Sequence, residues 1–121
     1  TVGEAKQRFT DAIADAATSR QVGYGLDSGV QMGPVITDQS KTRIETIIGQ
    51  AETEGATVLV DGRAPQISGY EQGYFVRPTI LQNIDPLGTI AKTEIFGPVL
   101  SLIHLEKIDD AIALINQNQY G

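Results

Sequence analysis

The stretch EIFGPVLSLIHL, residues 94–105, joins a Gly-Pro turn to the most apolar run of the chain. Residues 99–105 are almost continuously apolar, and this run is too short for a typical helix. It therefore predicts a β-strand that is covered on both faces. A helix is expected directly afterwards, because acidic residues favour a helix N-terminus and apolar residues recur at helical spacing. The acidic residues are Asp109 and Asp110, and the apolar ones are Ile108, Ile112 and Ile115. A strand followed by a helix predicts an α/β fold with a mostly parallel sheet flanked by helices.

Two further helices are expected nearer the N-terminus. Apolar residues recur every three or four positions over residues 2–18, which predicts an amphipathic helix. Thr37 and Asp38 are good N-cap residues, and the apolar spacing after them predicts a second helix that ends at Gly55. Residues 21–37 contain many glycines and no phosphate-binding spacing, so they are expected to form a long connecting loop.

Two further strands are expected between these helices and the opening stretch. Residues 57–60 form a β-branched run closed by an Asp-Gly turn, which predicts a short buried strand. Residues 74–81 are expected to be extended. Pro78 cannot donate a ladder hydrogen bond, so this strand should lie at a sheet edge or be interrupted at the proline.

The composition narrows the classes of function. The chain has 121 residues, a mass of 13.0 kDa, 40% hydrophobic residues and a net charge of -6. This is typical of one globular domain at most. The absence of any basic run argues against binding to nucleic acid or to an anionic membrane. There is no cysteine, so a thiol nucleophile and a thiolate metal site are excluded within these residues. No apolar run approaches the roughly 18 to 20 residues that cross a bilayer. Because the chain starts at Thr1, we expect it to begin partway through a longer protein.

Glu94 is the strongest candidate for a ligand contact. Pro98 fixes its own φ, and Gly97 can adopt backbone angles closed to other residues, so the preceding side chains are expected to be held in fixed directions. The apolar neighbours Ile95 and Phe96 make a plain solvated face an unlikely setting for this carboxylate. The pattern predicts a carboxylate aimed at a ligand.

Other polar groups have simpler explanations. His104 is the only histidine, and a satisfied strand residue is favoured over a catalytic one. Helix ends and solvent-facing positions explain the acidic pairs. These pairs are Asp109 with Asp110 and Glu52 with Glu54. Arg77 could bind an anion, although a surface ion pair or a solvated side chain is favoured. No serine lies in a nucleophile-elbow setting.

Five segments together resemble the aldehyde dehydrogenase superfamily. EIFGPV, residues 94–99, resembles its Glu-x-Phe-Gly-Pro signature. Similar family segments match residues 32–36 (MGPVI), residues 54–63, residues 73–80 (GYFVRPTI) and residues 116–121 (NQNQYG). Within the superfamily, three strings are most similar to the CoA-acylating methylmalonate-semialdehyde dehydrogenase branch. They are VGEAK at residues 2–6, DGR at residues 61–63 and GYE at residues 69–71. The resemblance spans essentially the whole chain.

The resemblance implies that the complete enzyme oxidises an aldehyde through a cysteine thiohemiacetal, passes hydride to NAD and releases the acyl group to water or CoA. Residues 1–121 would then be part of the catalytic domain. They would lack the catalytic cysteine, most of the cofactor domain and the oligomerisation arm, and the segment alone would be inactive. The family also implies a homo-oligomer in the cytoplasm or the mitochondrial matrix. Neither the aldehyde nor the choice between NAD and NADP is determined.

The resemblance assigns cofactor binding to two residues. Glu94 would accept hydrogen bonds from the hydroxyls of the nicotinamide ribose, and Phe96 would pack near that ribose and the nicotinamide. These residue types suit the task, because a carboxylate can accept from two neighbouring hydroxyls and a ring offers a flat apolar wall. The alternative is a stand-alone binding or scaffold module that kept the fold and lost the chemistry.

Overall fold

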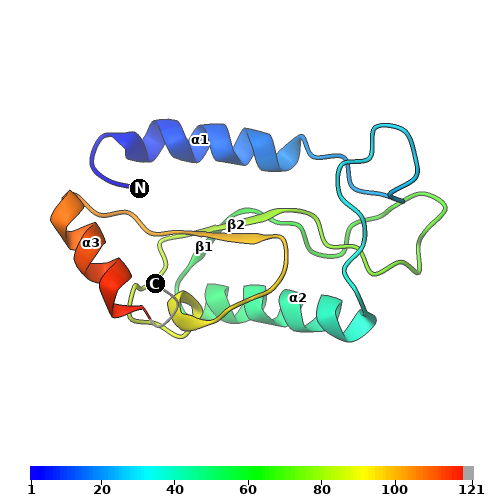
Figure 1. Cartoon of the computed structure of the whole chain (residues 1–121). Coiled ribbons are helices and arrows are strands. Elements are labelled where there is room, and N and C mark those ends of the chain that lie inside the picture. Colours follow the sequence, from blue (N-terminus) through cyan, green and yellow to red (C-terminus); the bar gives the residue numbers. More distant parts are fainter. Residues whose placement is uncertain (119–121) are drawn as a thin grey trace.

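A computed structural model describes residues 1–118, and its elements form layers around a small sheet (Figure 1). Helix α1 lies along one face of the sheet and helix α2 along the other, while α3 lies at one end. In chain order the elements are α1 (Ala5–Thr18), α2 (Asp38–Thr53), β1 (Thr57–Val60), β2 (Thr79–Gln82), the 3-10 helix η1 (Ile90–Lys92), β3 (Val99–Leu102) and α3 (Ile108–Gln117). The predicted α/β class is confirmed.

The sheet has the strand order β1-β2-β3 and is mixed. β2 and β3 pair in parallel, with Thr79 opposite Val99 and Gln82 opposite Leu102, as the strand-then-helix pattern predicts. β1 pairs with β2 in the antiparallel direction, so one of the two strand pairings described in residues 1–118 is parallel, whereas the sequence predicted a mostly parallel sheet. β2 is therefore the central strand. Backbone hydrogen bonds join the chain around the start of β2 to the turn after β1, at Gly62, and to the segment before β3, at Pro98.

The helices follow their sequence signals closely. The Thr37 side chain accepts a hydrogen bond from the Ser40 amide and caps α2, and Gly55 adopts a φ of +97° just after that helix. The start of α1 differs from the prediction. Helix α1 begins at Ala5, because Val2 instead pairs in parallel with Leu105 in an isolated bridge.

The strands are shorter and less buried than the sequence predicted. The expected strand over residues 74–81 is interrupted at Pro78, and β2 begins at the next residue in the centre of the sheet rather than at its edge. The prediction of burial for residues 57–60 is wrong, because β1 is only half-buried. The prediction that residues 99–105 are covered on both faces is also wrong. β3 ends at Leu102 and is an edge strand, and Leu100 is 41% exposed.

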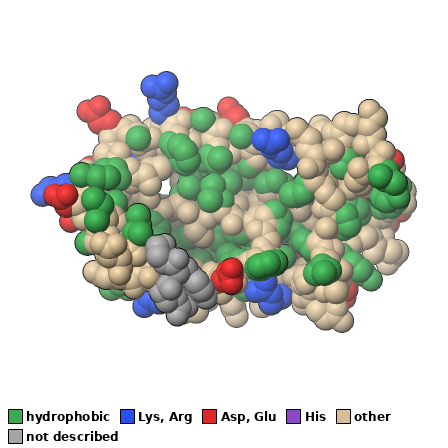
Figure 2. Space-filling model, in the orientation of Figure 1, with side chains coloured by type: hydrophobic (Ala, Val, Ile, Leu, Met, Phe, Trp, Pro, Cys, Tyr) green, Lys and Arg blue, Asp and Glu red, His purple; other side chains and the backbone are tan. Residues whose placement is uncertain are grey.

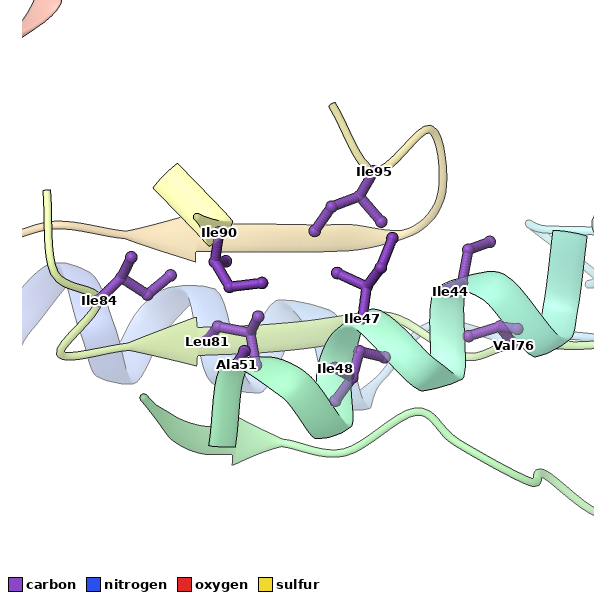
Figure 3. Packing of buried hydrophobic residues seen from close by; sticks show 9 residues of the cluster. All are labelled: Ile44, Ile47, Ile48, Ala51, Val76, Leu81, Ile84, Ile90 and Ile95. Atoms are coloured by element: carbon purple, nitrogen blue, oxygen red, sulfur yellow. The ribbon is translucent and has the colours of Figure 1, made fainter. Parts of the chain in front are cut away.

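The main core lies between α2 and the sheet (Figure 3). Its buried side chains come from α2, from β2 and its flanks, and from the segment that leads to β3. They are Ile44, Ile47, Ile48, Ala51, Val76, Leu81, Ile84, Ile90 and Ile95. By contrast, the apolar side chains of α3 are about half exposed, at 51–60% for Ile108, Ile112 and Ile115. Figure 2 shows further hydrophobic side chains at the surface between α1 and the sheet. None of the helices described in residues 1–118 has the length and apolar character needed to cross a membrane.

Candidate cofactor-positioning loop

Residues 94–98, called loop 94–98 below, connect η1 to β3 and contain both predicted site residues. Glu94 is exposed, and within residues 1–118 its carboxylate has no hydrogen-bond or ion-pair partner. The expectation that it lies away from a solvated face is therefore not met. Phe96 is 83% exposed, which is unusual for a large apolar ring. The loop thus presents a carboxylate and an aromatic ring, two residues apart, to the outside of the domain.

Helix α2 holds the middle of this loop. Ile95 is buried in the main core beside Ile44 and Ile47, so its side chain fixes the loop from within (Figure 3). Its carbonyl oxygen accepts a hydrogen bond from the Arg43 guanidinium. Gly97 lies directly against Ile44, since a Cβ at position 97 would be 2.6 Å from the Ile44 Cδ1 atom. Any side chain at this position would push the loop away from α2.

Strand β2 holds the end of the loop. The Thr79 amide donates to the Pro98 carbonyl at 2.8 Å, and the Val99 amide donates to the Gly97 carbonyl at 2.8 Å. Thr79 is fully buried, and its hydroxyl accepts a hydrogen bond from the Gly62 amide at 3.0 Å. This hydroxyl therefore joins β2 to the turn after β1 at the same point where β2 joins the loop.

The backbone of the loop is strained at Phe96 and not at Gly97. The sequence assigned the unusual backbone angles to Gly97, but the left-handed φ of +51° belongs to Phe96. Gly97 is needed for space against Ile44 instead. A bulky residue in the left-handed region costs roughly 1–3 kcal/mol, and it persists only when surrounding contacts hold it. Such strain is concentrated at functional sites, so it supports a functional interpretation of the loop.

A groove of about 320 Å³ runs beside the loop, between α1 and the start of β3. Its lining is largely apolar and includes Ala16, Ala17, Arg20, Gly97, Pro98 and Leu100. The alanines of α1 keep this groove open, because their side chains fill little space. The loop therefore borders a hollow on one side and the main core on the other.

The remaining polar candidates have structural partners or lie in solvent. Arg63 forms ion pairs with Glu52 at 2.6 Å and with Asp61 at 2.5 Å, and its side-chain hydrogen bond lowers the pKa of the Asp61 carboxyl. The same two acids raise the pKa of Arg63. His104 lies beyond the end of β3, with its ring nitrogens 3.2 Å from the Thr1 hydroxyl and 3.2 Å from the Glu106 carboxylate. The favoured role of His104, a satisfied residue, fits these contacts.

The other acidic candidates and Arg77 are exposed. Arg77, Glu54, Asp109 and Asp110 all face solvent. Among residues 1–118, no group of three or more His, Cys, Asp or Glu side chains is placed to hold a metal ion. Loop 94–98 combines two exposed candidate side chains with a backbone that α2 and β2 hold.

Sequence reasoning missed the residues that hold the loop. Arg43 and Ile95 are 52 positions apart, and no local pattern connects them. Gly62 was interpreted only as part of a turn. In the structure, a Cβ at position 62 would be 1.9 Å from the Arg77 carbonyl oxygen. The matched segment at residues 116–121 lies partly outside the described residues, since the structure describes the chain only as far as residue 118.

The fold is a layered α/β domain, and loop 94–98 is a loop positioned by a rigid scaffold, where binding residues are often found. The chain belongs to the aldehyde dehydrogenase family, whose family model matches residues 2–121. The match therefore includes the entire loop and all the elements that hold it.

Curated relatives and solved structures agree with this membership. The chain is 44% identical over 120 residues to the mitochondrial acylating methylmalonate-semialdehyde/malonate-semialdehyde dehydrogenase of Mus musculus, covering 99% of this chain and 22% of the relative. A crystal structure of methylmalonate-semialdehyde dehydrogenase from Oceanimonas doudoroffii matches with a TM-score of 0.92 and 37% identity, over 98% of this chain and 24% of that one. Betaine aldehyde dehydrogenase from Staphylococcus aureus, in complex with NAD+, matches with a TM-score of 0.90 and 33% identity, over 97% of this chain and 24% of that one. The chain thus spans about a quarter of the length of these proteins.

Proposed function

We propose that this chain is part of the catalytic domain of an NAD-dependent aldehyde dehydrogenase, in which loop 94–98 positions the nicotinamide end of the cofactor. Family membership and an NAD+-bound relative support the cofactor. The observation that carries the proposal is the loop itself, which exposes Glu94 and Phe96 on a backbone held by α2 and β2.

The side chains of the loop fit a nicotinamide ribose chemically. An ionised carboxylate accepts hydrogen bonds from two neighbouring hydroxyls, and Glu94 has no competing partner within residues 1–118. The Phe96 ring is widely exposed, so it can pack against the ribose and the nicotinamide ring. Bound NAD supplies the hydride acceptor of the oxidation. Glu94 and Phe96 bind and orient it, and a misplacement of about 1 Å can cost on the order of 100-fold in rate.

The names of the relatives support a proposal for the substrate and the acyl acceptor. Proteins named acylating methylmalonate- and malonate-semialdehyde dehydrogenases are similar over 99% of this chain. We therefore propose a short semialdehyde substrate and CoA as acyl acceptor. None of the 121 residues is a cysteine, so the thiol nucleophile of the family would come from outside this chain. A homo-oligomer in the mitochondrial matrix or the cytoplasm completes the proposal.

The test is Glu94→Gln in the full-length enzyme, measured as the KM for NAD and as kcat. A hydrogen bond to a charged group contributes about 1.5–3 kcal/mol, so kcat/KM for NAD should fall by roughly 10- to 100-fold. Glu54→Gln is the matched control, because Glu54 is also exposed but lies just after the far end of α2. Unchanged NAD kinetics in Glu94→Gln would remove this residue from the site. The 121-residue chain alone should not oxidise an aldehyde, and activity in a purified assay would contradict the assignment as a partial domain.

A further inference from the structure

Arg43 is the residue of α2 that reaches loop 94–98 through a hydrogen bond. Its guanidinium donates to the Ile95 carbonyl, which lies between the two predicted cofactor contacts. We propose that Arg43 is a positioning residue that holds this carbonyl and thereby keeps Glu94 and Phe96 in the geometry that binds the cofactor. This inference rests on the proposed function of the loop.

The contacts of Arg43 favour a dedicated role. Within residues 1–118, its guanidinium forms no ion pair and has no hydrogen-bond acceptor besides the Ile95 carbonyl. Arg63 behaves differently, because it pairs with two carboxylates and joins α2 to the turn after β1. Arg43 thus has one acceptor, and that acceptor is the backbone of the candidate site.

The loop needs a polar attachment at this point. Phe96 has a φ of +51°, which a bulky side chain adopts only when its neighbours are held. On one side of it Gly97 packs against Ile44, and on the other Ile95 is bonded to Arg43. Two adjacent residues of α2 therefore hold the two peptide units that flank Phe96, one by packing and one by a hydrogen bond.

Glu94 depends on the same attachment. Its carboxylate has no partner of its own within residues 1–118, so only the backbone that carries it limits the positions that the carboxylate can reach. The Ile95 side chain is buried, which fixes that residue's position, but burial of an aliphatic side chain does not fix the rotation of the adjoining peptide. The hydrogen bond from Arg43 supplies that rotational restraint, because a charged donor aligns with the carbonyl it serves.

Hydrogen exchange of the full-length protein without cofactor tests the restraint directly. We compare the wild type with Arg43→Ala, Arg43→Lys and the control Lys41→Ala, which removes a positive charge from the same helix without touching the loop bond. Backbone amides in the peptide spanning loop 94–98 should exchange about tenfold faster in Arg43→Ala, consistent with losing a charged hydrogen bond. Arg43→Lys, which keeps one donor, should be intermediate, and Lys41→Ala should match the wild type. Unchanged exchange in Arg43→Ala, or equal acceleration in Lys41→Ala, would overturn the inference.

Kinetics then connect the restraint to the cofactor. Arg43→Ala should raise the KM for NAD by about tenfold while changing the KM for the aldehyde less, and its effect should be non-additive with Glu94→Gln because both act through one loop. If Arg43→Ala does not fold, Arg43→Lys and Arg43→Gln carry the test. A large effect of Glu94→Gln with additive effects of Arg43 would refute only the positioning role. No effect of Glu94→Gln would refute the proposed function of the loop instead.

Discussion

Gly97→Ala is the substitution whose effect the structure defines most closely. The new Cβ would lie 2.6 Å from Cδ1 and 3.0 Å from Cγ1 of Ile44, well inside the separation of about 3.5–4.0 Å at which carbon atoms attract one another. Ile44 is fully buried and cannot rotate into solvent to make room. The loop, the helix or both must shift.

The expected cost combines two opposing terms. Inserting a methyl group into a packed core costs about 1–3 kcal/mol. Replacing glycine with alanine where the backbone angles allow it stabilises by about 0.4–1 kcal/mol, and Gly97 does not have a left-handed φ. We therefore expect a net destabilisation of about 1–2 kcal/mol. Gly33→Ala is the control, because a Cβ there meets nothing within 4 Å.

A double-mutant cycle isolates the contact. Ile44→Val removes the Cδ1 atom nearest to the new methyl group, and alone it should cost about 0.5–1.5 kcal/mol. Combined with Gly97→Ala, it should relieve the clash, so the double variant should be about 1 kcal/mol more stable than the sum of the single effects. Urea unfolding, followed by circular dichroism, measures the free energy of unfolding of the wild type, of both single variants and of the double variant. Strict additivity, or a stabilised Gly97→Ala, would refute the reasoning that space rather than backbone angle requires glycine.

Two further predictions concern the elements behind the loop. Gly62→Ala places a Cβ 1.9 Å from the Arg77 carbonyl oxygen, which can move away only if the backbone shifts. It should destabilise by more than about 3 kcal/mol in urea unfolding, whereas Gly25→Ala, with open space around it, should stay within about 0.5 kcal/mol of the wild type. Asp61 has a pKa below its ordinary value of 3.8 because Arg63 hydrogen-bonds to it. The interaction of Asp61 with Arg63 therefore contributes fully to the stability of the fold above pH 3.8. This contribution is lost as the pH falls through the lowered pKa of Asp61. Since the pair is partly exposed, Asp61→Asn should cost no more than about 1 kcal/mol at pH 7, and this cost should shrink as the pH falls below 3.8, which urea midpoints along a pH series would show.

Local signals predicted the helices and the existence of the strands. The cap at Thr37 and the glycine at position 55 determine where α2 begins and ends, because both act through their own backbone neighbourhood. The interruption at Pro78 was one of two predicted outcomes, the other being an edge strand, since proline cannot donate a ladder hydrogen bond. These features depend on a few adjacent residues, so the sequence alone is sufficient to find them.

Burial and strand order depended on partners that are distant in sequence. The apolar run that begins at Val99 was expected to be covered on both faces, yet β3 is an edge strand beside a groove. Apolar character shows that a strand can be buried but not which element covers it. The antiparallel pairing of β1 with β2 likewise depends on the path of the chain between residues 61 and 78, which no periodicity describes.

The loop shows how the candidate site and the core form one unit. Its signature predicted Glu94 and Phe96, and the glycine between them and the strand was assigned a role in backbone freedom. In the structure Phe96 has the unusual φ, and Gly97 packs directly against Ile44 of the core. A residue in such a conformation must be held by contacts stronger than its strain. The contacts come from α2 through Arg43 and Ile44 and from β2 through Thr79, all of them outside the signature.

This arrangement explains why an exposed carboxylate can serve in precise positioning. A side chain on a mobile loop would lose conformational freedom on binding, and that loss would weaken affinity for the ligand. Here the backbone under Glu94 is already ordered by buried Ile95 and by a hydrogen bond at Pro98, so only the side-chain rotamers remain to be fixed. The free energy that holds the loop is supplied during folding, by packing between α2 and the sheet. We therefore expect substitutions at positions 44, 79 and 97 to change cofactor binding as well as stability, because the same contacts hold the loop and the fold.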